Sequence, residues 1–196
     1  MKSGKARRPT PGGNRVLRII GGQWRGRKLQ FPDIEGVRPT PDRVRETLFN
    51  WLQPVITGAR CLDLFAGSGA LGWEGLSRGA ATMTMVEKAP AVARYLQQTG
   101  QLLQAEGARI QCADAVQYLQ GEAEPYDIIF LDPPFRQGLL ATCLESLISG
   151  RWLSEHALIY TEVEKELSPF PLPDGWQVRR HKQAGQVAYY LLERVA

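Results

Sequence analysis

The stretch Cys61-Leu62-Asp63-Leu64-Phe65-Ala66-Gly67-Ser68-Gly69-Ala70-Leu71-Gly72 decides the fold. It begins as a short apolar run, continues through a glycine-rich loop and ends in residues typical of a helix. The loop satisfies Gly-x-Gly-x-x-Gly between a predicted strand and a predicted helix, which is the context that this motif requires. Its glycines allow a tight turn and let a ligand approach the backbone. The stretch therefore predicts a βα unit for a nucleoside-containing cofactor, whose identity the glycines alone leave open.

Apolar runs continue to alternate with helical stretches after this unit. Strands are predicted at residues 61–65, 82–87, 109–113, 127–132 and 157–162, and helices at about 70–78, 90–105, after Asp114 and at about 137–149. Strands that are apolar along their length and alternate with helices indicate a parallel sheet covered on both faces. Two last strands, at 176–182 and 186–193, share a tight turn and must be antiparallel. We expect a doubly wound, Rossmann-like α/β fold closed by a hairpin.

The N-terminal part has a different character. Basic residues among glycines and prolines predict a flexible arm over residues 1–14, and residues 18–29 predict a short strand, a glycine turn and a second strand. Thr40 is then placed to cap a helix that begins at Pro41. We expect an extension made of a hairpin and a helix over residues 15–55, and the α/β domain over residues 56–196.

The helix of this extension has one apolar face, on which residues recur at helical spacing: Val44, Leu48, Trp51 and Leu52. Three charged residues are expected on its other faces: Arg43, Arg45 and Glu46.

Charge is distributed unevenly along the chain. The first 45 residues hold 12 Lys and Arg and three Asp and Glu, which gives this segment a net charge of +9. The other 151 residues hold 12 Lys and Arg and 17 Asp and Glu, which gives them a net charge of −5. A basic arm on a mildly acidic body suggests a polyanionic partner, although a tail that aids solubility would have the same composition.

Composition excludes several protein classes. With 43% hydrophobic and 22% charged residues among 196, the chain is not mainly disordered. No apolar run approaches the ~18 residues of a membrane span, and residues 1–15 lack the apolar segment of a secretory signal. Three cysteines far apart, Cys61, Cys112 and Cys143, argue against a disulfide framework or a zinc site. We expect them to be buried in a protein of the reducing cytoplasm.

Acidic residues at the strand ends narrow the choice of cofactor. Asp63 lies four residues before Gly67, where a dinucleotide would have to place a pyrophosphate that a carboxylate repels. S-adenosylmethionine instead presents an ammonium and a sulfonium. Glu87 is positioned to accept hydrogen bonds from a ribose diol. Asp114 is positioned to bind an adenine amino group, to cap a helix, or to do both.

The sequence Asp132-Pro133-Pro134-Phe135 follows the fourth strand and is the most specific signal. Two prolines fix the backbone at the edge of the sheet where ligands bind in such folds. An amino group entering here can donate one hydrogen to the Asp132 carboxylate and the other to the Pro133 carbonyl, while Phe135 stacks on the base. Its nitrogen lone pair can then attack a methyl carbon in line. A loop that merely ends a strand would explain the prolines but not the residues around them.

These residues carry a resemblance to a known family. The segment from Leu62 to Gly69, Glu87, Asp114-Ala115 and the Asp-Pro-Pro-Phe loop are similar to motifs of S-adenosylmethionine-dependent amino-methyltransferases. With residues 18–27 and 38–52, the chain over about residues 15–195 resembles the RsmD family of bacterial 16S rRNA guanine-N2 methyltransferases, whose name assigns guanine 966. The tetrapeptide alone is shared with DNA adenine and cytosine methyltransferases and with protein glutamine methyltransferases.

The resemblance implies a seven-stranded sheet, S-adenosylmethionine as donor without a metal, and N2-methylguanine as product. It also implies a substrate within the small ribosomal subunit or its assembly intermediate, and we expect a monomer. The resemblance implies catalytic roles for four residues: Asp132, Pro133, Pro134 and Phe135. It also implies that Arg43 closes over the cofactor and that a further set of residues binds it: Asp63, Phe65, Ala66, Gly67, Ser68, Gly69, Glu87, Lys88, Asp114 and Ala115.

Reaching an amino group in structured RNA requires a base that is turned out. Trp24 and Phe135 are candidate stacking platforms, although Trp24 would serve equally well to pack the hairpin onto the body. Contacts to phosphate are expected from a set of basic residues: Arg15, Arg18, Arg25, Arg27, Lys28 and Arg38.

Other residues are given structural roles. His156 and His181 are expected at the surface, and Trp73, Trp152 and Trp176 in the core. A last group is expected on a solvated face: Glu162, Glu164 and Glu166.

Three alternatives stay open on the sequence. A nicotinamide oxidoreductase would use the same glycine loop but would leave Asp63 and the Asp-Pro-Pro-Phe loop unexplained. A non-catalytic RNA-binding protein would retain the fold without transfer. An N-methyltransferase of another RNA or DNA amino group would share the chemistry with a different substrate.

Overall fold

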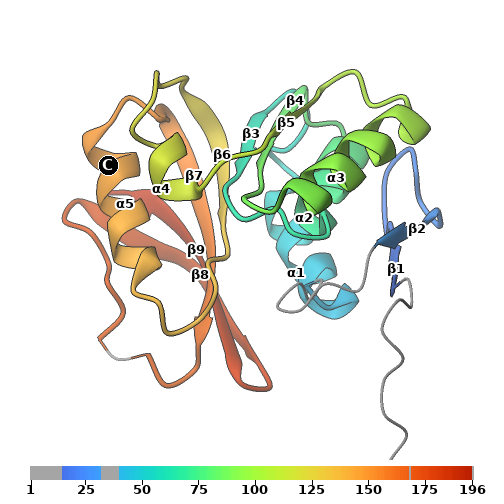
Figure 1. Cartoon of the computed structure of the whole chain (residues 1–196). Coiled ribbons are helices and arrows are strands. Elements are labelled where there is room, and N and C mark those ends of the chain that lie inside the picture. Colours follow the sequence, from blue (N-terminus) through green and yellow to red (C-terminus); the bar gives the residue numbers. More distant parts are fainter. Residues whose placement is uncertain (1–14, 32–39, 168, 196) are drawn as a thin grey trace, which may run out of the picture.

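The computed structural model describes residues 15–31, 40–167 and 169–195 of the chain. The expected arm over residues 1–14 and the expected phosphate contact Arg38 lie outside these ranges. Within them, the chain forms a sheet of seven strands, with helices on both faces (Figure 1). The predicted Rossmann-like α/β fold is thereby confirmed.

The predicted βα units are all present. In chain order they are β3 (Arg60–Asp63), α2 (Ala70–Ser77), β4 (Thr82–Val86), α3 (Pro90–Leu103), β5 (Ala108–Gln111), α4 (Ala115–Tyr118), β6 (Tyr126–Leu131), α5 (Leu139–Ser149) and β7 (Leu153–Glu164). The closing hairpin is β8 (Trp176–Ala184) and β9 (Val187–Arg194).

Strand order creates the place where a ligand can bind. The order across the sheet is β5-β4-β3-β6-β7-β9-β8, with β3 parallel to both β4 and β6 and with β9 antiparallel to β7 and β8. The chain first builds outward from β3 through β4 to β5 and then crosses to β6. The strand order therefore reverses between β3 and β6, and ligands of open α/β sheets bind beyond the carboxyl ends at such a point.

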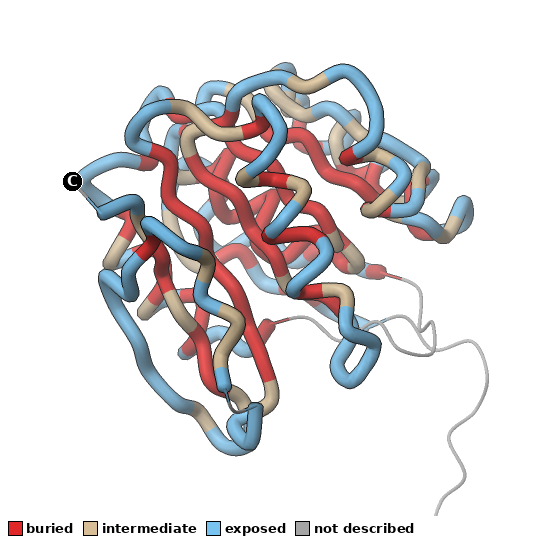
Figure 2. The backbone as a smooth tube through the Cα atoms, turned by 90° about the vertical axis from the view of Figure 1, so that its left-hand side faces the viewer, coloured by how far each residue is buried: buried red, intermediate tan, exposed pale blue. Residues whose placement is uncertain are grey.

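Each face of the sheet has its own hydrophobic core. Cys61, Met83 and Phe130 face a core shared with the N-terminal elements, α2 and α3, whereas Leu62 and Ile129 face the core beneath α4 and α5. Neighbouring strand residues point to opposite faces, so strands that are apolar along their length serve both cores. Figure 2 shows these buried strands at the centre of the molecule.

The N-terminal hairpin packs against the first of these cores. Strands β1 (Arg15–Arg18) and β2 (Lys28–Phe31) form a separate antiparallel pair, followed by α1 (Asp42–Leu52). Leu17, Leu29 and Phe31 are buried in the same core cluster as helices α1 to α3. The division of the chain at residues 55 and 56 stays a prediction, but the hairpin is not isolated from the body.

The turn of this hairpin lies directly on the end of α2. The backbone N–H of Gln23 donates to the Ser77 carbonyl at 2.7 Å, and the Ser77 hydroxyl donates to the Gly21 carbonyl at 2.6 Å. A Cβ atom at Gly22, whose φ is +74°, would lie 1.7 Å from the Ser77 carbonyl oxygen. Glycine is required there because the two backbones are in contact.

Arg45 corrects the prediction for α1. The helical spacing predicts a position away from the buried face, yet the Arg45 side chain is fully buried, with ion pairs of 2.6 Å to Asp42 and 3.3 Å to Glu74. It also donates to the Arg18 carbonyl at 2.8 Å. Helical spacing could not reveal this burial, because it depends on a glutamate in α2 and on the docked hairpin.

Glu74 is the centre of this ion network. Besides Arg45 it pairs with Arg78 at 2.7 Å, and it accepts the backbone N–H groups of Ile20 and Gly21 at 2.9 and 2.8 Å. A buried carboxylate is tolerable when it is paired and hydrogen-bonded in this way. The network therefore fastens the hairpin and α1 to α2.

Two smaller expectations are also wrong. Pro41, not Thr40, is the residue before the first helical residue Asp42, and no side chain caps α1. Cys112 is exposed, whereas Cys61 and Cys143 are buried as expected. Cys112 follows β5, which is an edge strand and has a neighbour on only one side.

The remaining core predictions hold. Trp73, Trp152 and Trp176 are buried, and His156 and His181 are exposed. Among the helices within the described ranges, none combines the length and the apolar character that crossing a membrane would take.

Candidate functional site

Five acidic side chains lie at or just beyond the carboxyl ends of the parallel strands. Asp63 ends β3, Glu87 follows β4, Asp114 follows β5, Asp132 follows β6, and Glu162 is near the end of β7. Parallel strands bring their carboxyl ends to one edge of a sheet, so residues up to 99 positions apart in the chain gather there.

Asp63 is held by the loop that follows it. Its carboxylate accepts the backbone N–H groups of Phe65 and Gly72. It is only 2% exposed, and burial, together with the nearby charge of Glu87, raises its pKa to about 7, which the two N–H groups partly oppose. A carboxyl group in this state gains from a cationic ligand, which would favour its ionised form.

The glycine-rich loop turns between Asp63 and α2. Gly67 and Gly69 have φ values of +50° and +77°, and the Gly67 N–H donates to Glu87 at 3.0 Å. A Cβ at Gly69 would lie 2.3 Å from Trp73 Nε1, and one at Gly72 2.5 Å from Met85 Sδ. Gly69 and Gly72 thus permit close packing of α2 on the sheet, while Gly67 orients Glu87.

Glu87 and Asp114 are both fixed by backbone amides. Glu87 also accepts the Ala89 N–H at 2.7 Å. Asp114 caps α4 by accepting the N–H groups of Val116 and Gln117 at 2.9 and 3.3 Å. Capping is therefore one role of Asp114, and its exposed position leaves room for a second.

The other residues expected near the cofactor line the same loops. Phe65 is partly buried, Ala66, Ser68 and Ala115 are buried, and Lys88 is exposed. Arg43 is exposed on the first turn of α1. No contact within the described ranges joins Arg43 to the carboxylates, so its closure over a ligand stays a prediction.

Asp132 lies between two other acids. Burial, then the charge of Glu162 and that of Asp63, raises its pKa well above the ordinary value. No residue of the described ranges donates a hydrogen bond to its carboxylate. Asp63 and Asp132 are neighbours because β3 and β6 pair, with Asp63 opposite Phe130. A carboxyl group with these surroundings is stabilised by accepting a hydrogen bond from a bound ligand.

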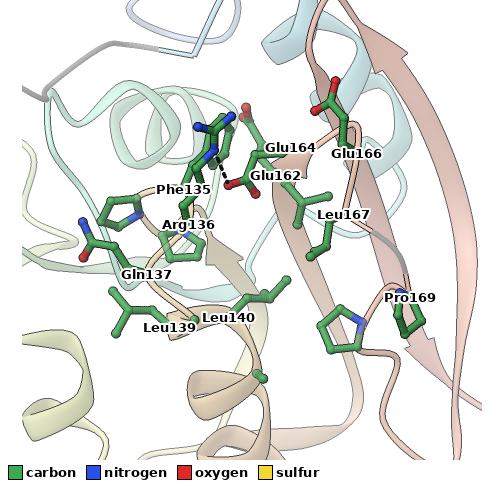
Figure 3. Close-up of a pocket in the computed structure, with 16 residues that line it drawn as sticks. Phe135, Arg136, Gln137, Leu139, Leu140, Glu162, Glu164, Glu166, Leu167 and Pro169 are labelled. Carbon is green, nitrogen blue, oxygen red and sulfur yellow. Dashed lines mark ion pairs between the residues drawn. The ribbon is translucent and has the colours of Figure 1, made fainter.

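The loop after Asp132 forms one wall of a pocket of about 500 Å³. Pro133 is buried, Pro134 is exposed, and Phe135 is 40% exposed. Figure 3 shows the pocket between this loop, the start of α5 and the segment after β7. Its lining is largely apolar: Pro133, Pro134, Phe135, Leu139, Leu140, Val163, Leu167, Pro169 and Pro171, with Glu162 and Glu164 among the polar members. An apolar pocket with few polar groups suits a planar base.

Glu162 is a residue that the sequence interpretation missed. The sequence predicts a solvated position for Glu162, yet its side chain is 6% exposed and lies in the pocket wall. The Tyr160 hydroxyl donates to it at 2.9 Å, and the Thr40 hydroxyl is a second partner. The signal was available, because Leu158, Tyr160 and Glu162 alternate on one face of an apolar strand. Glu164 is partly buried, and Glu166 alone of the three is exposed as expected.

The basic residues and the tryptophan of the hairpin differ in exposure. Arg15, Arg18, Arg25, Arg27 and Lys28 are exposed. Trp24, however, is only 8% exposed and belongs to the core. Its expected role as a stacking platform is corrected in favour of packing the hairpin onto the body, because little of its ring is left for a base.

Comparisons with known proteins cover all of these features. The family model described as conserved hypothetical protein 95 matches residues 17–193. Ribosomal RNA small subunit methyltransferase D of Escherichia coli K12 is 51% identical over 190 residues, which cover 97% of this chain and 96% of that protein. The protein of the same name from Haemophilus influenzae is 44% identical over 188 residues, covering 94% and 97%.

A solved structure gives the same result for the fold. The Escherichia coli protein yhhF superposes with a TM-score of 0.86 at 51% identity, over 91% of this chain and 98% of that one. Residues 17–193, which the family model matches, include both the hairpin turn and the Asp-Pro-Pro-Phe loop.

Proposed function

The chain belongs to the family described as conserved hypothetical protein 95, and from this premise we propose that it methylates ribosomal RNA of the small subunit. The reaction is transfer of a methyl group from S-adenosylmethionine to the exocyclic N2 of a guanine in 16S rRNA, guanine 966 by the family's name. The RNA is presented in the small subunit or its assembly intermediate, and the enzyme acts as a monomer.

One observation carries this proposal. The Asp132 carboxylate directly precedes Pro133 and Pro134 in the pocket wall, and no residue of the described ranges donates a hydrogen bond to it. The Pro133 carbonyl beside it has no described donor either. Two unused acceptors on one short loop match the two hydrogens of an amino group.

The residues present fit S-adenosylmethionine. The cofactor carries an ammonium, a sulfonium, ribose hydroxyls and an adenine amino group, all of which are cationic or donate hydrogen bonds. Asp63, Glu87 and Asp114 offer carboxylates along the strand ends, and burial of Asp63 makes a positive partner favourable. We assign the ammonium or sulfonium end to Asp63, the ribose to Glu87 and the adenine to the loop of Asp114.

When held by these residues, S-adenosylmethionine would supply an electrophilic methyl group, and its sulfur would leave with the electron pair of the carbon–sulfur bond. Asp132 and Pro133 accept the two amino hydrogens and favour a pyramidal nitrogen with a localised lone pair. Phe135 stacks on the base and holds it flat. Positioning of this kind is worth up to roughly 7–11 kcal/mol. The raised pKa of Asp132 then suits it to take the proton that the alkylated nitrogen releases.

Exposed cations of the hairpin hold the RNA. Arg25, Arg27 and Lys28 lie on or beside the turn that is fastened to α2. Contacts from such side chains to phosphate position the RNA without reading its sequence. Bases are read in the pocket instead.

The proposal is tested with small subunits isolated from cells that lack the enzyme. Tritium from labelled S-adenosylmethionine should enter their 16S rRNA, and mass spectrometry of nucleosides should identify N2-methylguanosine at one mapped position. Large subunits serve as the matched control and should stay unlabelled. Label found in adenosine or cytidine would overturn the assignment. An absence of label, together with binding of NADH in calorimetry, would overturn it as well.

A further inference from the structure

The carboxylate of Glu162 lines the same pocket as the catalytic loop. Pro133, Pro134 and Phe135 form one part of the lining and Glu162 another (Figure 3). Glu162 provides the strongest of the charges that act on Asp132, ahead of Asp63. Glu162, near the end of β7, therefore faces the space beside the loop that Asp132 begins after β6.

Glu162 is fixed in this place by neutral donors. The Tyr160 hydroxyl donates to its Oε1 at 2.9 Å, and burial keeps the pKa of Tyr160 well above its usual value, so that the hydroxyl stays a donor. Thr40, just before α1, supplies the second hydroxyl. Among the described residues, no cation lies within ion-pair distance of Glu162. A buried acid without a cation is costly to keep, which points to a role beyond packing.

The chemistry of the bases says what such an acid can recognise. Guanine presents the N1–H between its O6 acceptor and its 2-amino group, so two neighbouring donors lie on the side of the exocyclic amine. Adenine and cytosine place a ring nitrogen with a lone pair next to their amino groups. A carboxylate only accepts hydrogen bonds when ionised, so it pairs with the N1–H of guanine and opposes a lone pair at that position.

We propose that Glu162 is the residue that makes the pocket selective for guanine, by accepting the N1–H while Asp132 and Pro133 accept the hydrogens of the 2-amino group. This inference rests on the proposed function, because it assumes that the Asp132 loop holds the exocyclic amine. Tyr160 and Thr40 act as positioning residues, since they direct the Glu162 carboxylate without touching the base. A site built to pair with a substrate N–H rejects analogues that lack it.

The test compares two bases at the target position of 16S rRNA in reconstituted small subunits. One is guanine, and the other is 2-aminopurine, which keeps the 2-amino group but lacks O6 and has a lone pair in place of the N1–H. The wild-type enzyme should prefer guanine by about 10- to 100-fold in kcat/KM, the range for one hydrogen bond to a charged group. Equal rates on the two particles would overturn the inference without any variant.

The variant Glu162→Gln should reduce this preference to within about threefold, because the glutamine amide can donate to the lone pair of 2-aminopurine. Glu155→Gln, an exposed glutamate on the same strand, should keep the wild-type preference. A folded Glu162→Gln enzyme that still prefers guanine as the wild type does would contradict the assignment. If this variant does not fold, the wild-type comparison decides alone.

The outcomes separate the two proposals. Failure of the wild-type enzyme to methylate the guanine particle overturns the proposed function. Methylation of guanine with no loss of preference in Glu162→Gln overturns only the role of Glu162.

Discussion

Glu74 is buried and Asp132 is partly buried, and the surroundings of the two carboxyl groups differ. Glu74, in the core between α2 and the hairpin, pairs with Arg45 and Arg78 and accepts two backbone N–H groups. Asp132, at the edge of the sheet, faces Glu162 and Asp63, and no described cation or donor reaches it. The Glu74 carboxylate therefore finds all its partners within the chain, whereas the described charged groups around Asp132 are other acids.

This difference distinguishes structure from function. A buried charge that is fully paired serves to hold elements together, and its loss is costly because a partner is left alone. A set of buried acids without cations has raised pKa values and is stabilised by a ligand that brings positive charge or donors. This distinction would fail if Glu74 made no contribution to stability, or if the acids around Asp132 behaved as paired structural charges.

The largest effect is expected at the paired group. Replacing Glu74 by alanine leaves Arg45 buried beside a single acid, Asp42, and leaves the Ile20 and Gly21 N–H groups without an acceptor. We expect the free energy of unfolding in urea to fall by about 3–5 kcal/mol. Glu46→Ala, at an exposed position of α1, should change it by less than about 0.5 kcal/mol. Equal losses for the two variants would show that the network is not structural.

A smaller effect, which depends on pH, is expected at Asp63, one of the acids that have no described cation beside them. The pKa of Asp63 is raised from 3.8 to about 7, so the folded state holds its proton more tightly than the unfolded chain does. Its contribution is therefore favourable at low pH and is lost as the pH rises through about 7. Relative to wild type, Asp63→Asn should gain about 2 kcal/mol of stability between pH 5 and 7, with no further gain above pH 8. A difference independent of pH would mean that Asp63 is paired after all.

The smallest effect concerns the exposed cations. Arg27→Ala should weaken binding to small-subunit RNA by a few fold and lower the slope of log affinity against log salt by about one. Arg151→Ala is the matched control, because this arginine is also exposed but lies before β7, outside the hairpin. Filter binding at several salt concentrations measures both. Identical slopes for the two variants would mean that the hairpin does not touch phosphate.

Much of the fold was predictable because the signals are local. The run from Cys61 to Phe65 is apolar along its length, as a strand covered on both faces must be, and the glycines after it mark the turn into α2. The short turn at Ala184 and Gly185 left no room for a crossover, which fixed the antiparallel end. Each of these features is decided within a dozen residues.

The sequence did not reveal the partners of side chains from distant segments. Arg45 is buried because Glu74 and the hairpin surround it, and Trp24 is buried because Ser77 and the core receive the turn. Glu162 belongs to the pocket because Tyr160 and Thr40 hold it beside Asp132. A run of three alternating acids, Glu162, Glu164 and Glu166, resembles a solvated face until the fold shows which of them lies inward.

The central claim is that the unpaired Asp132 carboxylate holds the amine that is methylated. The most direct test measures, in Asp132→Ala, the single-turnover rate of methyl transfer to small subunits together with S-adenosylmethionine affinity by calorimetry. We predict that the rate falls by about 100- to 1000-fold while the affinity stays within about threefold of wild type. Transfer at the wild-type rate by this variant would contradict the account.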